Sequence, residues 1–423
     1  MSMITKAYRE KEGFRLFLKL LMIFLISRLF MLIMMIVYNK TKGVDYSISF
    51  LMNEWDAKWY ARMTEKGYMF PTDYNPQASW AFFPMYVLTC RCLYLICGGL
   101  ISADWVGIIV SNVCIFIAAY TAVKYVRDLK TSKLKAEVDG RKKESLASLA
   151  DQGKEHEGPS GDGNRSLLIG LLMFMAPYTF YCAAMYTEAM FIMFIALFFR
   201  ACQKRKYLLA GLFSALASAS RIVGCTLVFA LLVELYLDYE ERAQVQTLAK
   251  KVLGFVLDTI EQPKRVLGLM LCPLGTFSYM LYLYFFCGDP WAFMHVQIAW
   301  REEHYFPILG VLYKACTGQI ENRYTYMGWF CIAMFGIYIY MIVRKHYSMG
   351  IFGIIALLIP LTSHVMSTCR FTVGSYVVFV GLYDLLDRMK GKLLWLKYLI
   401  LAGFFVAEAF ALYIWYNSDC WLM

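Results

Sequence analysis

The stretch AFFPMYVLTCRCLYLICGGL, residues 81–100, decides how this chain is arranged. Its length would allow it to cross a membrane as a helix. Its Phe-Phe-Pro start and its central Cys-Arg-Cys are, however, typical of an interfacial helix. If it crossed, the loop 127–165, with nine Lys and Arg, would lie outside. If it lies along the surface or dips in and returns, every later basic loop lies inside, as the positive-inside rule requires. We therefore expect no crossing at 81–100.

The composition predicts an all-α polytopic membrane protein with a single integral membrane domain over 1–423. Sixty per cent of the 423 residues are hydrophobic, and the 17% that are charged fall well below the roughly 25% of soluble domains. The apolar residues form long blocks, several approaching the roughly 20 residues of a membrane span. The blocks predict about eleven transmembrane helices, at roughly 15–38, 104–126, 166–182, 186–200, 207–220, 222–238, 266–287, 325–343, 350–366, 372–386 and 393–416.

Charge asymmetry supports this order of crossings. With the N-terminus inside, the inner segments carry 28 Lys and Arg and the outer segments 11. The inner loop 127–165 mixes Lys, Glu, Asp, Gly and Ser, so we predict a disordered cytoplasmic linker there. The net charge of +11 is then explained by the basic inner segments of a membrane protein. We therefore expect no nucleic acid as a partner.

Several kinds of site are not indicated. The thirteen cysteines show no metal-ligand spacing and mostly lie in apolar runs, where cysteine serves as a small apolar residue. His295, His304 and His364 are scattered, so we expect no metal site. The sequence has no nucleotide-binding glycine loop, which argues against ATP-driven transport.

The first outer loop, predicted over 39–103 with interfacial helices, carries the most informative polar residue. Asp56 lies among Trp55, Trp59 and Tyr60, just after the first apolar span. Packing alone explains a carboxylate among aromatic rings at a membrane surface poorly. Asp56 is well placed to take a proton from a hydroxyl group as a general base, while the aromatic side chains bind a ring. The alternatives are that it caps a helix or pairs with Lys58 or Arg62.

Other outward-facing turns also carry polar side chains near the membrane, at Glu188, Arg221, Gln297, Trp300, Arg301 and Arg370. A charge at membrane depth costs a few kcal/mol, so each charged residue needs a partner or a task. Arginines such as Arg221 and Arg370 bind phosphate through fork-like hydrogen bonds, and an intramolecular salt bridge is the alternative for each. Glu188 either pairs with Arg221 or belongs to a substrate site. Gln297 and Trp300 either line a sugar pocket or cap a short interfacial helix.

A base, two arginines and an aromatic loop are thus expected at the outer face of one helical bundle. This combination predicts a lipid-borne phosphate substrate that enters sideways from the bilayer. The base would deprotonate an acceptor hydroxyl, and the arginines would stabilise the departing phosphate.

These motifs resemble the PIG-V family of mannosyltransferases, within the GT-C superfamily of polyprenyl-phosphate-sugar-dependent glycosyltransferases. The resemblance covers most of the chain. Its specific part is the first loop, with WDAKWY at 55–60, Gly-Tyr at 67–68 and AFFP at 81–84. Later turns are similar as well: YTEA at 186–189, Ser-Arg followed by a glycine at 220–224, and CRF at 369–371, where bacterial relatives tend to have Pro-Arg-Tyr.

The resemblance implies a GT-C-like bundle whose first outer loop carries the active site. It implies inverting transfer of mannose from a dolichol- or undecaprenyl-phosphate-linked donor to a lipid or glycan acceptor at the extracytoplasmic face. Asp56 would be the base, and no cofactor or obligatory metal would take part. In the eukaryotic branch the product is the second mannose of the GPI anchor, made in the endoplasmic reticulum.

The chain departs from that eukaryotic branch. It has no Tyr-Trp-Asn-Val-Gly-Phe segment, and carries Gly288-Asp289-Pro290 with Gln297 and Trp300 instead, which is similar to the bacterial branch. We therefore expect the plasma membrane, or the endoplasmic reticulum membrane if the source is eukaryotic.

Two other functional classes remain open. A multipass lipid or sugar transporter or flippase would show inverted repeats and broken helices at mid-membrane. The sequence shows no internal repeat, and its unusual polar residues fall on one side. A non-catalytic membrane assembly subunit would need no Trp-Asp loop.

Overall fold

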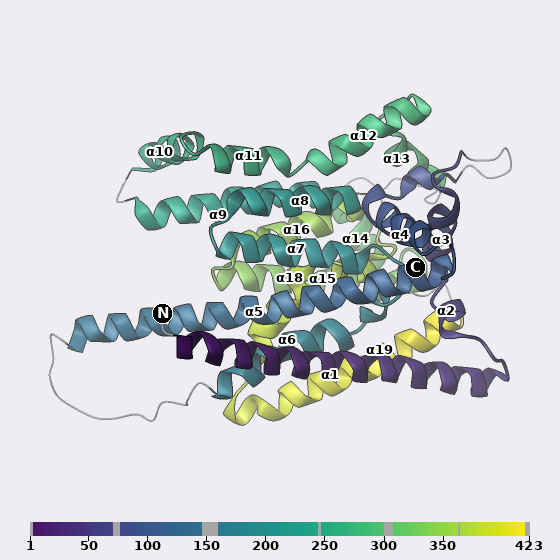
Figure 1. Cartoon of the computed structure of the whole chain (residues 1–423), viewed down its shortest axis with the longest axis horizontal. Helices are drawn as coiled ribbons and strands as arrows, with labels where there is room; N and C mark the ends of the chain where they lie inside the picture. Colours follow the sequence, from purple (N-terminus) through teal and green to yellow (C-terminus); the bar gives the residue numbers. More distant parts are fainter. Residues whose placement is uncertain are drawn as a thin grey trace.

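The structure, a computed structural model, is helical throughout the part of the chain that it describes, residues 3–70, 77–145, 160–243, 247–299, 308–362 and 364–418. No strand occurs within these ranges. Long helices lie side by side and run back and forth along the longest axis of the molecule (Figure 1). The expected all-α class is confirmed.

The α-helices follow one another in this order: α1 (Met3–Lys42), α2 (Ile48–Leu51), α3 (Asp56–Lys66), α4 (Pro84–Ile96), α5 (Ala103–Ser145), α6 (Ser160–Met175), α7 (Glu188–Gln203), α8 (Tyr207–Ser220), α9 (Leu227–Arg242), α10 (Leu248–Ile260), α11 (Pro263–Leu271), α12 (Leu274–Cys287), α13 (Ala292–His295), α14 (Ile308–Cys316), α15 (Asn322–Val343), α16 (Tyr347–Leu361), α17 (Thr368–Val373), α18 (Tyr376–Asp387) and α19 (Leu394–Tyr416). Short 3-10 helices lie between some of them, including η2 (Thr179–Cys182), η3 (Ile222–Thr226) and η4 (Val296–Ala299).

Several of these helices can span a membrane, as expected of a multi-pass protein. Within the described residues, five segments are long and apolar enough: Glu12–Lys42, Ala103–Thr131, Ile222–Arg242, Asn322–Val343 and Gly391–Tyr416. A sixth is formed if α11 and α12, which bend by 46° at the break between them, make one span.

The remaining predicted crossings coincide with shorter helices. α8 has 14 residues and is about 21 Å long at 1.5 Å per residue, less than the roughly 30 Å of a hydrocarbon core. α7 is apolar on all sides because it lies inside the bundle, packed against α5 and α8. The structure thus supports five or six spans, and the figure of eleven stays a prediction.

The segment 81–100 forms the short helix α4 at one end of the bundle. Pro84 occupies its first turn, and Gly98 and Gly99 follow its end with positive φ values of 59° and 73°. Before it, Asn53 donates a hydrogen bond of 2.7 Å to Asp104 in the first turn of α5. The chain therefore leaves and re-enters the bundle at the same end (Figure 1), the arrangement expected of a segment that does not cross.

The predicted disordered linker 127–165 is wrong at both ends. α5 continues to Ser145, and α6 already begins at Ser160. The reason is local, because residues 127–145 are rich in Lys and also contain Arg, Glu and Leu, which favour helix. Within the predicted linker, residues 146–159 lie outside the described part of the chain.

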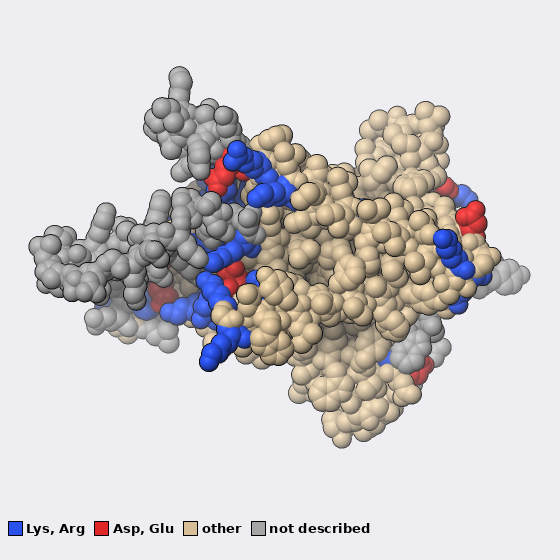
Figure 2. All heavy atoms as spheres, turned by 90° about the horizontal axis from the view of Figure 1, so that it is seen from below, with Lys and Arg blue, Asp and Glu red and all other residues tan. Residues whose placement is uncertain are grey.

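Basic side chains gather at the other end of the molecule. Figure 2 shows Lys and Arg crowded at the left, the end at which α5 and α9 finish in Figure 1. Ion pairs join neighbouring helices there, including Arg200 with Asp128 at 2.6 Å and Lys130 with Asp387 at 2.8 Å. This one-sided distribution agrees with the predicted cytoplasmic end.

Candidate functional site

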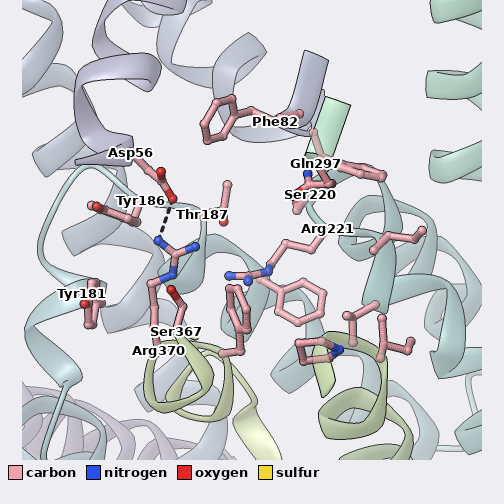
Figure 3. Close-up of a pocket in the computed structure, with 18 of the residues that line it drawn as sticks. Asp56, Phe82, Tyr181, Tyr186, Thr187, Ser220, Arg221, Gln297, Ser367 and Arg370 are labelled. Carbon is pink, nitrogen blue, oxygen red and sulfur yellow. Dashed lines mark hydrogen bonds and ion pairs between the residues drawn. The ribbon is translucent and has the colours of Figure 1, made fainter. Parts of the chain in front are cut away.

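The ends of α3, α7, α8 and α17 meet around one cavity of about 660 Å³, at the end of the bundle opposite the basic end (Figures 1 and 3). This volume lies within the usual range for small-molecule sites. Asp56, Arg221, Gln297 and Arg370 line it, although they are far apart in the sequence.

Asp56 is the first residue of α3, and its position depends on an unusual backbone conformation. Trp55, directly before it, has φ 54° and ψ −117°, a conformation that side chains other than glycine rarely adopt. Ser367, next to α17, also has a positive φ, 62°. Such strain persists only where the surroundings impose it, and it clusters at functional sites.

The partner of Asp56 comes from α17. Arg370 Nη1 donates a hydrogen bond of 2.7 Å to Asp56 Oδ2 (Figure 3). The alternatives left open for Asp56 are both wrong. The helix-capping position belongs to Trp55, and Lys58 pairs with Glu54 at 2.7 Å. Arg62, six residues further along α3, lies over the ring of Trp59.

Glu188, the first residue of α7, lies close to both arginines on their buried side. Its side chain is only 1% exposed, and its Oε1 accepts a 2.6 Å hydrogen bond from Arg221 Nη1. Arg370 Nε lies 3.1 Å from the same oxygen, an ion-pair distance without hydrogen-bond geometry. Glu188 thus pairs with Arg221, as one of its two interpretations expected, but it is not among the residues that line the cavity, and its place in a substrate site stays a prediction.

Arg221 is held in place by a tight turn between α8 and η3. It has an extended backbone, and Gly224, three residues later, lies against the backbone of α8. A Cβ added to Gly224 would come within 2.4 Å of Ala217 C and Ser218 N. Glycine is therefore required for the chain to turn so closely and direct Arg221 toward the cavity (Figure 3).

The four charged side chains form a chain of alternating sign. It runs from Asp56 through Arg370 and Glu188 to Arg221, two carboxylates and two guanidiniums. Burial alone would lower the pKa of Arg370, but Asp56 and Glu188 outweigh it and hold that pKa above its usual value. The guanidinium therefore stays charged.

The rest of the cavity wall is apolar or aromatic. One side is aliphatic, formed by Ile222, Val223, Ile359, Pro360 and Met366. The aromatic side includes Trp55, Tyr60, Phe82, Phe83 and Phe293. Burial raises the pKa of Tyr60, so its phenol stays protonated. The cavity thus joins a charged floor to an apolar wall.

Most of the sequence-predicted site residues come together here. Trp55, Tyr60 and Gln297 line the cavity. Trp59 is not among the lining residues, because its ring stacks on Phe82 at 5.9 Å between centroids and supports the wall from outside. Trp300 and Arg301 lie outside the described residues.

Sequence reasoning missed some lining residues, among them Tyr181, Ser375 and Trp415. Trp415 lies near the end of the last helix, and its Nε1 donates to Leu51 O at 2.9 Å, which fixes the loop before Asp56. Tyr181 belongs to η2, in the turn before Glu188. A weak signal existed for Tyr181, since it lies in the same turn as the chosen Glu188.

No group of three or more His, Cys, Asp or Glu side chains suited to a metal ion occurs within the described ranges. The chemistry that the site offers is a carboxylate, two guanidiniums, hydroxyl groups and aromatic rings. Comparison with models of known protein families and with curated proteins finds no match for this chain.

Proposed function

We propose that this protein is a GT-C-type membrane glycosyltransferase that transfers mannose from a polyprenyl-phosphate-linked donor to an acceptor hydroxyl at the extracytoplasmic face. The observation that carries the proposal is one cavity in which Asp56, two arginines and an aliphatic wall meet. A lipid phosphate that carries a sugar presents the matching groups, namely an anion, an apolar chain and a ring.

Asp56 acts as the base. Its carboxylate accepts the proton of the acceptor hydroxyl as the acceptor oxygen forms a bond to the anomeric carbon of the donor. The bond from that carbon to the phosphate oxygen breaks, and the lipid phosphate leaves with the bonding electrons. Attack opposite the leaving phosphate inverts the anomeric centre.

Arg221 and Arg370 receive the phosphate. Their guanidinium groups point toward each other across the floor of the cavity (Figure 3). Arg221 uses Nη1 for Glu188, its guanidinium lies 4.7 Å from the centre of the Phe371 ring, and its other N–H groups make no hydrogen bond within the described ranges. Guanidinium forks match phosphate oxygens and stabilise the charge that develops as the phosphate departs.

The aliphatic side of the cavity receives the start of the polyprenyl chain. It is formed by η3 and α16, and it continues from Arg221 through Ile222 and Val223. The aromatic side, with Trp55 and Phe82, is suited to the face of a sugar ring. The acceptor is a lipid or glycan hydroxyl, and the resemblance favours the plasma membrane, or the endoplasmic reticulum membrane if the source is eukaryotic.

Mass spectrometry of lipid-linked and surface glycans tests the proposal in cells from which this protein has been deleted. We expect one class of glycan to lack a hexose. Complementation with the wild-type chain restores it, and complementation with Asp56→Asn does not. Unchanged glycans in the deletion strain would refute the proposal and favour a transporter or an assembly subunit.

A further inference from the structure

Arg370 contacts the proposed base in this structure, yet the proposed function also requires it for the donor phosphate. We propose that Arg370 exchanges partners: it holds the Asp56 carboxylate while the donor site is empty, and it turns to the donor phosphate when the donor binds. Asp56 is then released toward the acceptor. This inference rests on the proposed function and adds an order of events to it.

The charges of the site require such an exchange. Asp56 and Glu188 already balance the two arginines, so the charged floor of the empty cavity is formally neutral. An added phosphate diester brings one negative charge into a partly buried site. The remaining N–H groups of Arg221 can bond the phosphate, but its charge is offset only if a guanidinium also gives up a carboxylate, since unpaired charge in such a place is costly.

Asp56 is the carboxylate that can be given up. The Arg370 and Asp56 side chains are 16% and 21% exposed to the cavity, whereas Glu188 is 1% exposed. Glu188 lies behind both arginines and receives the short Arg221 hydrogen bond. It is therefore the fixed point about which the Arg370 guanidinium turns, with Nε kept near Glu188 and Nη1 moving from Asp56 to the phosphate.

Within the described residues, the side chain of Asp56 has Arg370 as its single hydrogen-bond partner. Its side chain has one hydrogen bond there, to Arg370 Nη1, and no bond to the loop that carries it. The exchange thus frees the Asp56 carboxylate for the acceptor hydroxyl only after the donor is in place, and the donor binds before the acceptor is activated.

Equilibrium binding tests the exchange without any need to know the acceptor. The full-length protein in detergent micelles is titrated with undecaprenyl phosphate, and with undecaprenol as the uncharged probe. Asp56→Asn and Asp56→Ala remove the carboxylate that competes with phosphate for Arg370. We expect both variants to bind undecaprenyl phosphate roughly tenfold more tightly than wild type, about the effect of one charge-assisted hydrogen bond, and to bind undecaprenol unchanged.

Glu54→Gln is the matched control, because Glu54 lies two residues from Asp56 and pairs with Lys58 instead of either arginine. It removes the same charge from the same loop, and we expect its Kd for undecaprenyl phosphate to stay within about twofold of wild type, since the Glu54 carboxylate pairs with Lys58 and lies outside the cavity lining. If wild type prefers the phosphate but the Asp56 variants bind it no more tightly, Arg370 does not exchange partners, and the proposed function still stands. If wild type shows no preference for the phosphate over the alcohol, both the donor and the exchange are wrong.

Discussion

Arg370 Nη1 lies 2.7 Å from Asp56 Oδ2, although 314 residues separate the two in the sequence. The contact joins the first outer loop to α17 near the other end of the chain, and it brings a carboxylate and a guanidinium to one cavity. Arg370 and Arg221 were expected to bind phosphate or to form intramolecular salt bridges, and in the structure carboxylates distant in the sequence pair with both.

Asp56→Asn should lower the rate of mannosyl transfer by at least ~10²-fold, the usual lower size of a general-base contribution. Asn keeps the shape of the side chain and can still contact Arg370, but it cannot accept the proton. The rate is measured with purified protein, donor and the acceptor found in the glycan comparison. Glu54→Gln should retain the wild-type rate. Wild-type turnover by Asp56→Asn would rule out Asp56 as the base.

The charged residues of the site could be predicted from the sequence because charge is conspicuous in an apolar chain. Asp56, Arg221 and Arg370 each stand out for this reason, and all three line the same cavity. Their pairing could not be predicted, since it depends on how distant turns meet. Trp415 was missed because aromatic residues make up 17% of the chain, so one more in a membrane helix gives no signal.

Helix type and position were easier to predict than helix ends and crossings. Long apolar blocks predict helices by themselves, as α15 and α19 show. The end of α5 was missed because a polar, charged segment was taken for a linker, although its Lys, Arg and Glu residues also favour helix. The number of crossings depends on whether a short apolar helix such as α7 is covered by lipid or by protein, which one sequence does not specify.

Topology can be tested with a single introduced cysteine. In a cysteine-depleted background, a cysteine at Ser160 should not react with an impermeant thiol reagent added from outside, because the basic segment before α6 is expected in the cytoplasm. A cysteine at the exposed Asp45, beyond the end of α1, should react from outside. Labelling of the Ser160 site in intact cells would reverse the assignment of every later loop.

Trp55→Gly should give a more stable protein than Trp55→Ala, by roughly 1 kcal/mol or more, because only glycine adopts this backbone conformation without strain. Both variants lose the ring equally, so the comparison isolates the backbone at φ 54° and ψ −117°. Thermal unfolding of the two purified variants measures the difference. Equal midpoints would mean that Trp55 relaxes to an ordinary conformation and does not position Asp56 by strain.

Gly224→Ala should destabilise the protein by about 1–3 kcal/mol, the usual cost of forcing an extra methyl group into a packed position. Its Cβ would meet the α8 backbone at 2.4 Å, and the turn that carries Arg221 would have to shift. Gly403→Ala in α19 is the matched control, since nothing lies within 4 Å of the added Cβ. The thermal midpoint should fall for Gly224→Ala alone, and undecaprenyl phosphate binding should weaken with it. A similar midpoint for both variants would contradict the close packing of this turn.

Arg221→Lys and Arg370→Lys should each weaken undecaprenyl phosphate binding roughly tenfold, since lysine keeps the charge but loses the planar fork that bonds two oxygens at once. Arg62→Lys is the control, because Arg62 lies over the Trp59 ring outside the cavity lining. The loss should be specific to phosphate, so undecaprenol should bind all four proteins equally. Asp56→Asn, in contrast, should bind the phosphate more tightly than wild type, as the partner exchange of Arg370 requires. If both cavity variants bind undecaprenyl phosphate as wild type does, the two arginines serve only as structural partners of Glu188, and the phosphate lies elsewhere in the cavity.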